Sequence, residues 1–228
     1  MSKRIAAVTG AFGALGKVVV GHLVEQGYAV AALDLAASPA SALPDGTLVL
    51  GGIDLTDEHG ASGAFERVRS ELGGLDVLIN IAGGFAWETL ADGEIETWDR
   101  MYRLNLKTAL VACRTALPHL RKSQSGRIVN VGANAALRSG AGMGAYAASK
   151  SAVMRLTESL AEELKGSGLT VNAVLPSIID TPANRADMPD ADPSTWVAPD
   201  ELAFAIGFLA SQRASAVTGA LLPVVGRV

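Results

Sequence analysis

Residues 5–16 read IAAVTGAFGALG, an apolar run followed by three glycines spaced three residues apart. The apolar run is typical of a buried strand, and the apolar residues of 15–26 recur at helical spacing. A strand, a glycine turn and a helix start leave main-chain N–H groups and the positive end of the helix dipole facing a bound anion. The stretch predicts a phosphate-binding turn, in which Gly10 allows the turn, Gly13 the approach of a diphosphate and Gly16 close helix packing. A glycine-rich turn without a ligand is the alternative.

Asp34 ends the next apolar run, 28–33, and lies 18 residues after Gly16. This is close to the offset of about 20 residues at which a carboxylate binds the adenosine ribose of a dinucleotide. A carboxylate there accepts from both ribose hydroxyls and repels a 2′-phosphate. Because no Arg or Lys lies between Lys17 and Arg67, the sequence predicts NAD(H) in preference to NADP(H). A surface aspartate at a strand end is the alternative.

Tyr146 and Lys150 lie four residues apart in the stretch GAYAASK, residues 144–150. On a helix this spacing puts the phenol and the ammonium on one face. A phenol titrates near 10 in water, and a positive charge beside it favours the phenolate and lowers the phenol pKa. The pair is therefore predicted to transfer protons. Such spacing is common by chance, so its weight comes from the phosphate turn in the same chain.

The 228 residues and the apolar content of 49% fit one domain, 1–228, with a large core. The net charge of −4 and the scattered lysines and arginines give no indication of a nucleic-acid partner. Cys113 is the only cysteine, so no disulfide can form within the chain, which fits a reducing cytoplasm. His22, His59 and His119 are far apart in sequence, and no residues have the spacing of a metal site.

The sequence predicts neither a signal peptide nor a membrane span. The basic start 1–4 is followed by only four apolar residues before Thr9, too few for the apolar region of a signal peptide. No apolar run approaches the length of about 18 residues that crosses a bilayer. We therefore expect a cytoplasmic protein without a membrane partner.

Short β-rich runs alternate with longer helical runs along the chain. The predicted strands are 4–9, 28–33, 47–51, 77–81, 127–131, 170–175 and 221–225. The predicted helices are 15–26, 58–72, 95–120, 145–165 and 199–210. This alternation predicts an α/β fold, a single-domain doubly wound parallel sheet of about seven strands that binds ligands at the carboxyl ends of its strands. We interpret the irregular, proline-containing stretch 177–198 as a lid over the substrate, with a solvent-exposed loop as the alternative.

Over nearly its whole length the chain resembles the short-chain dehydrogenase/reductase family. The shared features are the glycine turn, Asp34, Asp54-Leu55, Asn80-Ile81-Ala82-Gly83, the Tyr146/Lys150 pair, and Pro176 with Thr181. The resemblance implies a Rossmann-like sheet, with Tyr146 as proton donor or acceptor. It also implies that Lys150 lowers the pKa of Tyr146 and binds the nicotinamide ribose. Asn105 would position a water for proton relay.

The same resemblance implies a set of contacts to the nicotinamide dinucleotide. These are Gly10, Phe12, Gly13, Leu15, Gly16, Asp34, Leu35, Asp54, Leu55, Ala82, Gly83, Tyr146, Lys150, Pro176, Ile178 and Thr181. Within this set, Asp54 and Leu55 would hold the adenine, and Ala82 and Gly83 the adenosine ribose. The last three residues of the set would border the nicotinamide.

Ala133 departs from the family pattern, because the family's catalytic serine lies 13 residues before the tyrosine. Alanine has no hydroxyl to donate to a developing oxyanion, and losing one such donor typically costs about 2.7–4 kcal/mol of activation free energy. Dihydropteridine reductases, a subgroup that also lacks the serine, reduce an electron-poor conjugated ring that needs this donor less. The chain resembles them locally, around 13–16, 82–86 and 175–189, although Asn105 is not expected in that subgroup.

A flat substrate would need an apolar slot. The candidate residues, next to Ala133, are Phe85, Trp87, Met143, Met188 and Trp196. Ordinary core or loop packing is the alternative. We therefore expect an NADH-dependent reductase of a small planar conjugated compound, pterin-like or quinone-like, with Tyr146 as the proton donor.

Two other functions stay open. One is an NAD(P)-dependent carbonyl or secondary-alcohol oxidoreductase that tolerates Ala133, such as a 3-oxoacyl reductase-like enzyme. The other is a non-catalytic dinucleotide-sensing protein. The long alanine-rich helices 95–120 and 145–165 have apolar residues on more than one face, which favours association into a homodimer or homotetramer.

Overall fold

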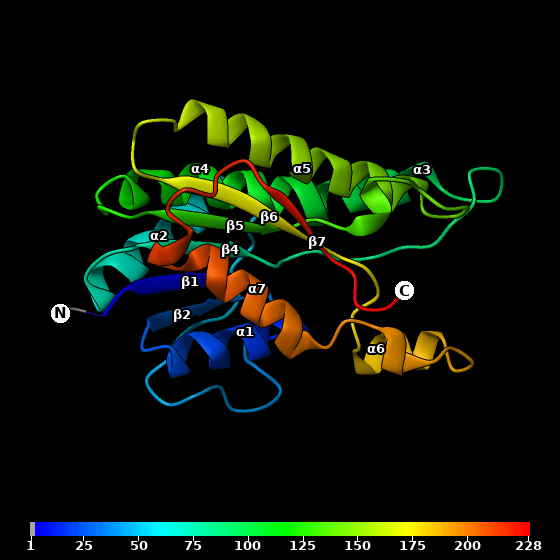
Figure 1. Cartoon of the computed structure of the whole chain (residues 1–228), viewed down its shortest axis with the longest axis horizontal. Coiled ribbons are helices and arrows are strands. Elements are labelled where there is room, and N and C mark those ends of the chain that lie inside the picture. Colours follow the sequence, from blue (N-terminus) through cyan, green and yellow to red (C-terminus); the bar gives the residue numbers. More distant parts are fainter. Residues whose placement is uncertain (1–2) are drawn as a thin grey trace.

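The computed structural model describes residues 3–228, so part of the basic start, Met1 and Ser2, lies outside the described residues. A parallel sheet of seven strands crosses the molecule in the order β3-β2-β1-β4-β5-β6-β7 (Figure 1). The strands are β1 (Ile5–Thr9), β2 (Ala29–Leu33), β3 (Leu48–Leu50), β4 (Val77–Asn80), β5 (Arg127–Val131), β6 (Thr170–Pro176) and β7 (Leu221–Val224). The doubly wound, Rossmann-like prediction is confirmed. The strand order reverses between β1 and β4, the place at which such sheets bind ligands.

Helices cover both faces of the sheet. They are α1 (Ala14–Glu25), α2 (Glu58–Leu72), α3 (Ile95–Met101), α4 (Thr108–Leu120), α5 (Gly144–Glu163), α6 (Pro182–Asp187) and α7 (Pro199–Ala210). α1 and α7 lie on one face, and α2, α4 and α5 lie on the other (Figure 1). Ala6 and Val8 of β1 pack toward α1 and α7, whereas Ile5 and Ala7 pack toward the opposite helices. Burial on both faces explains why the first four residues of the strand, 5–8, are all apolar.

The predicted helix 95–120 is interrupted by a π-helical segment, Tyr102–Lys107, between α3 and α4. There the main-chain N–H of Thr108 bonds to the oxygen of Arg103, five residues earlier. Apolar periodicity does not reveal one wider turn within a continuous helix. Such segments are frequent at functional sites, and Asn105 lies inside this one.

The stretch 177–198 is not irregular throughout, as the sequence had suggested. It contains α6, and Ile179 pairs with Val197 in an isolated parallel bridge. The Thr181 hydroxyl caps α6 by accepting from the N–H of Asn184 at 3.2 Å. A helix this short is set by its cap and by Pro182 at its start, and it has no apolar period to detect.

Two further observations concern residues 3–228 only. No helix there combines the length and the apolar character needed to cross a membrane. In the same range, no three His, Cys, Asp or Glu side chains lie close enough together to hold a metal ion.

Candidate active site

The residues singled out from the sequence gather where the strands end. Gly10 follows β1, Asp34 follows β2, Ala82 lies just beyond β4, Ala133 lies just beyond β5, and Pro176 ends β6. In a parallel sheet these carboxyl ends share one edge. The fold therefore brings together side chains and turns that are far apart in the sequence.

The glycine turn is held against the rest of this edge by close main-chain approaches. Gly10 has a φ of +64°, and an added Cβ would lie 2.7 Å from the nitrogen of Ala82. A Cβ at Gly16 would lie 2.1 Å from the oxygen of Gly10. Gly13 is different, because it is exposed and a Cβ there would meet only that same oxygen, at 3.4 Å. Close main-chain contacts therefore require glycine at positions 10 and 16, whereas the Cα of Gly13 faces open space at the surface.

Asp34 joins the glycine turn to the end of β2. One carboxylate oxygen accepts from the main-chain N–H of Phe12 at 2.9 Å, and the other accepts from that of Ala36 at 3.0 Å. The Thr9 hydroxyl joins the end of β1 to the loop after β4 by accepting from the N–H groups of Ile81 and Ala82 at 3.2 and 3.3 Å. The sequence analysis did not predict this role. The position of Thr9 directly before Gly10 was the available signal.

A cavity of about 330 Å³ lies beside the end of β2. It is lined by Leu35, Asp54, Thr56, Glu96, Asp99, Arg100, Arg103 and Leu104. It thus joins Asp54, which is expected at the adenine, to Leu35, another member of the expected dinucleotide set. Leu55, the second residue expected at the adenine, is buried in the core. Hydrogen bonds from the Thr56 main chain and hydroxyl hold the pKa of Asp54 below its usual value, so this carboxylate is charged.

Tyr146 and Lys150 both lie on α5, as expected, but burial dominates their protonation. Lys150 is buried and donates from Nζ to the main-chain oxygen of Val131 at 2.8 Å. Burial raises the pKa of Tyr146 to about 12 and lowers the pKa of Lys150 to about 8. Desolvation disfavours the charged form of each group, so burial acts against the lowering of the Tyr146 pKa that the resemblance implies for Lys150. The phenol is protonated at pH 7.

Asn105 is buried at the centre of a hydrogen-bond cluster. Its Nδ2 donates to the oxygen of Gly84 at 3.0 Å and to the Ser149 hydroxyl at 2.9 Å. Its Oδ1 accepts from the N–H of Gly84 at 2.9 Å. Ser149 in turn donates to the main-chain oxygen of Tyr146 at 2.7 Å. Asn105 and Ser149 thus tie the π-helical segment and the loop after β4 to α5; Ser149 was missed, although it lies in the stretch 144–150.

Some of the candidate substrate residues come together, and others do not. The Phe85 ring meets the Tyr146 ring edge-on, with centroids 4.9 Å apart, and Trp87 lies against Gly142. Met143 follows Gly142 and caps α5, while Ala133 is buried. Met188 ends α6 and is half-buried.

Trp196 does not fit the predicted slot. It is only 4% exposed, so its ring belongs to the protein interior. An aromatic residue in a loop often anchors that loop, and the sequence alone does not distinguish such an anchor from a slot wall.

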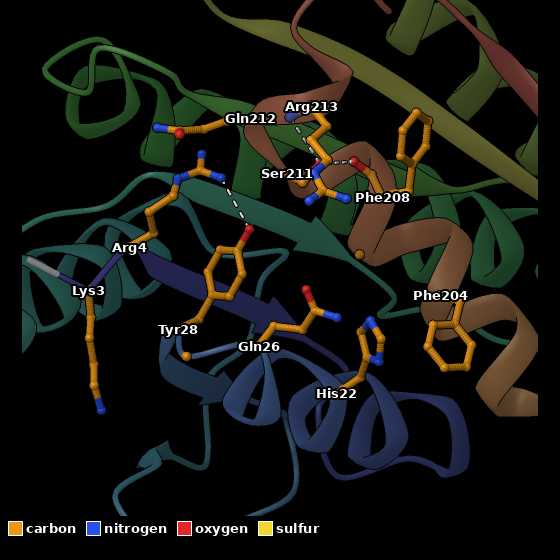
Figure 2. Close-up of a pocket in the computed structure, with 12 residues that line it drawn as sticks. Lys3, Arg4, His22, Gln26, Tyr28, Phe204, Phe208, Ser211, Gln212 and Arg213 are labelled. Carbon is orange, nitrogen blue, oxygen red and sulfur yellow. Dashed lines mark hydrogen bonds between the residues drawn. The ribbon is translucent and has the colours of Figure 1, made fainter. Parts of the chain in front are cut away.

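A second hollow, of about 710 Å³, lies at the opposite end of the sheet, between α1 and α7 (Figure 2). It is lined by Lys3, Arg4, His22, Gln26, Gly27, Tyr28, Phe204, Gly207, Phe208, Ser211, Gln212 and Arg213. None of these is a residue predicted for the site. Arg4 donates to the main-chain oxygens of Ala210 and Ser125, each at 2.7 Å, and so fastens the end of α7. We therefore place the candidate active site at the carboxyl edge.

Comparisons with known proteins agree with this geometry. Residues 4–192 match the family model of the short chain dehydrogenases. A 4-formylbenzenesulfonate dehydrogenase from Comamonas testosteroni is 34% identical, with 99% of this chain and 98% of the relative covered. A 3-oxoacyl-(acyl-carrier-protein) reductase from Vibrio cholerae is 32% identical, with 98% and 96% covered. The crystal structure of a 3-ketoacyl-(acyl-carrier-protein) reductase from Brucella melitensis complexed with NADH is 28% identical, with a TM-score of 0.86 and 98% and 97% covered.

These relatives correct the expected substrate. Their names concern formyl and oxoacyl compounds, and none of the three concerns a pterin or a quinone. The expectation of a pterin-like or quinone-like substrate is therefore not supported. The carbonyl or secondary-alcohol alternative fits better, and the local resemblance around 82–86 and 175–189 gave too much weight to a few loop positions.

Proposed function

The chain belongs to the short-chain dehydrogenase family and is an NAD(P)-dependent oxidoreductase, and we propose that it interconverts a carbonyl compound and the corresponding alcohol. The observation that carries this proposal is geometric: Tyr146 and Lys150 of α5, with Asn105 bonded to Ser149 between them, lie at the sheet edge that also holds the glycine turn. Tyr146, Lys150 and Asn105 are the proposed catalytic group, and the substrate and cofactor meet beside them.

The residues at this edge fit a nicotinamide dinucleotide. Gly13 would leave the main chain open to the diphosphate, Asp34 would bind the adenosine ribose, and the cavity at Leu35 and Asp54 would hold the adenine. The bound dinucleotide would supply or accept the hydride. We propose that NAD(H) is preferred, because the Asp34 carboxylate would repel a 2′-phosphate.

Tyr146 would act as the acid during carbonyl reduction. As hydride reaches the carbonyl carbon, the phenol proton passes to the carbonyl oxygen, which gives the alcohol and leaves a phenolate. The ammonium of Lys150, one helical turn away, would stabilise that phenolate once it forms. Asn105, through Ser149 and Gly84, holds α5 at a fixed place beside the loop after β4. A water at Asn105 would return a proton from solvent.

Three further proposals concern the whole molecule. The segment 177–198 follows β6 at the carboxyl edge of the sheet, so we propose that it covers the bound substrate. Tyr102 and Leu110 expose apolar surface along 95–120, which supports a homodimer or homotetramer. Cys113 is a buried free thiol, and we propose a cytoplasmic enzyme of one domain.

The experiment compares wild type with Tyr146→Phe, using Tyr102→Phe as the matched control. Removing the acid should lower kcat for carbonyl reduction about 100-fold or more, with NADH affinity nearly unchanged. The control, an exposed tyrosine, should retain full activity. Steady-state NADH oxidation and a fluorescence titration with NADH measure the two quantities. Unchanged turnover in Tyr146→Phe would remove this phenol from the chemistry.

A further inference from the structure

Two large aromatic side chains of the loop after β4 stand exposed, and one of them contacts the proposed proton donor. Phe85 is 56% exposed although its ring meets Tyr146 edge-on, with an angle of 75° between the rings. Trp87 is 62% exposed and rests on Gly142, where an added Cβ would lie only 2.2 Å from the indole. Covering exposed aromatic surface with a flat apolar group lowers the free energy of the complex, so such surface beside a reacting group favours binding of that kind of group.

Two charged side chains of this region, Lys150 and Glu88, have hydrogen-bond partners of their own. Ala133 is 2% exposed and offers no hydroxyl, and the Lys150 ammonium is directed to the oxygen of Val131. The Glu88 carboxylate is turned into its own loop, where it accepts from the main-chain N–H of Glu94 at 3.0 Å. The surface offered to a substrate here is therefore aromatic and apolar, which favours an uncharged flat group.

We propose that the substrate carries an aryl group bonded directly to its reacting carbonyl carbon, as in an aromatic aldehyde and its benzylic alcohol, and that Phe85 and Trp87 select it. The carbonyl oxygen must reach the Tyr146 phenol, and Phe85 is in contact with that phenol. The group next to the carbonyl therefore lies against Phe85. This inference rests on the proposed carbonyl–alcohol function and names its substrate class.

An aryl group also compensates for the missing hydroxyl at position 133. In the oxidation direction, the Tyr146 phenol would first release its proton to solvent through the water at Asn105. The C–H electron pair of the benzylic alcohol would then leave as hydride to the oxidised dinucleotide, and the O–H proton would pass to the Tyr146 phenolate. The carbon–oxygen double bond forms, and the products are the aldehyde, the reduced dinucleotide and the phenol. The ring stabilises the positive charge that develops on the carbinol carbon as hydride departs. Ala133 then costs less than it would with an alkyl substrate.

The test uses two aldehydes of similar size, benzaldehyde and cyclohexanecarboxaldehyde, with NADH. Wild type should show a kcat/KM about 10-fold or more higher for benzaldehyde, although its carbonyl is the less electrophilic of the two. Phe85→Leu keeps an apolar side chain but removes the ring, and should reduce that ratio roughly 5-fold or more. Phe204→Leu is the matched control, because Phe204 is 62% exposed on α7 and lines the remote hollow. The control should keep the wild-type ratio.

The outcomes separate the two proposals. If wild type uses both aldehydes equally well, or if Phe85→Leu keeps the full preference, aryl selection is overturned and the carbonyl–alcohol function stands. If the protein binds NADH but reduces neither aldehyde nor any simple ketone, the proposed function falls and the aryl inference falls with it. NADH binding by each variant verifies that it is folded.

Discussion

Asn105 and Gly84 are joined by two reciprocal hydrogen bonds, with Oδ1 accepting from the N–H of Gly84 at 2.9 Å and Nδ2 donating to its oxygen at 3.0 Å. The two residues are 21 positions apart and belong to different elements, the π-helical segment and the loop after β4. Because the same amide also donates to Ser149, it fixes three parts of the active site with one side chain.

Asn105→Ala should therefore reduce both stability and activity. It leaves the polar groups of Gly84 without their partner, and an unsatisfied buried polar group costs about 1–3 kcal/mol. We expect a loss of about 2 kcal/mol in the free energy of unfolding, measured in urea, and a lower kcat. Gln124→Ala, which removes an amide at an exposed position after α4, is the control and should change both far less. An unchanged urea midpoint would contradict the structural role of this amide.

Lys150 should carry a stability cost that depends on pH. Its pKa is lowered from 10.5 to about 8 by burial. Between these values the unfolded chain binds more protons than the folded one, so the contribution of Lys150 to the free energy of unfolding increases as pH rises through that window. Lys150→Met should consequently be more stable than wild type at pH 7 and lose this advantage by pH 10, while being inactive. Urea unfolding at the two pH values tests it; parallel curves would disagree with a buried ammonium.

Ala133→Ser should restore a hydrogen-bond donor beside Tyr146. One oxyanion donor is worth roughly 100-fold or more in rate where its geometry is right. We expect the largest gain in kcat/KM for alkyl ketones and a smaller gain for aryl aldehydes. Ala135→Ser, in the following short helix, is the control and should show no gain. If neither substrate class benefits, position 133 does not face the reacting oxygen.

Two of the turn glycines, Gly16 and Gly13, should respond differently to alanine. Gly16→Ala places a Cβ 2.1 Å from the oxygen of Gly10 and should unfold or distort the turn. Gly13→Ala meets only a 3.4 Å contact, so the protein should keep its thermal stability while NADH binding weakens. Differential scanning fluorimetry and NADH titration separate the two effects. Equal NADH affinity in wild type and Gly13→Ala would place the diphosphate elsewhere.

Asp34→Ser should relax the choice between cofactors. The ratio of kcat/KM for NADH to that for NADPH should fall about 10-fold, because the carboxylate that repels a 2′-phosphate is gone. Some stability should also be lost, since the Phe12 N–H loses its acceptor. Asp45→Ser, at an exposed position in the loop before β3, is the matched control. A ratio that does not move would assign cofactor choice to another residue.

The strands and the glycine turn could be predicted because they depend on local pattern. The strands read as apolar runs, and Gly10 and Gly16 are required where main chains approach closely. The effect of burial on the pKa of Tyr146 could not be predicted, because the spacing shows the neighbouring ammonium but not the burial of the phenol. The π-helical segment Tyr102–Lys107 and the interior position of Trp196 also depend on tertiary contacts. The apolar periodicity of the sequence therefore reveals neither of them.

The wider turn at Tyr102–Lys107 gives the long helix one residue more than a regular spiral needs between the same two ends. Deleting a residue within it would leave α3 and α4 in place and rotate the Asn105 side chain about 100° around the axis, away from Gly84. In this protein, then, the insertion or deletion of a single codon, and not only a substitution, can move the Asn105 amide into or out of contact with the reaction centre.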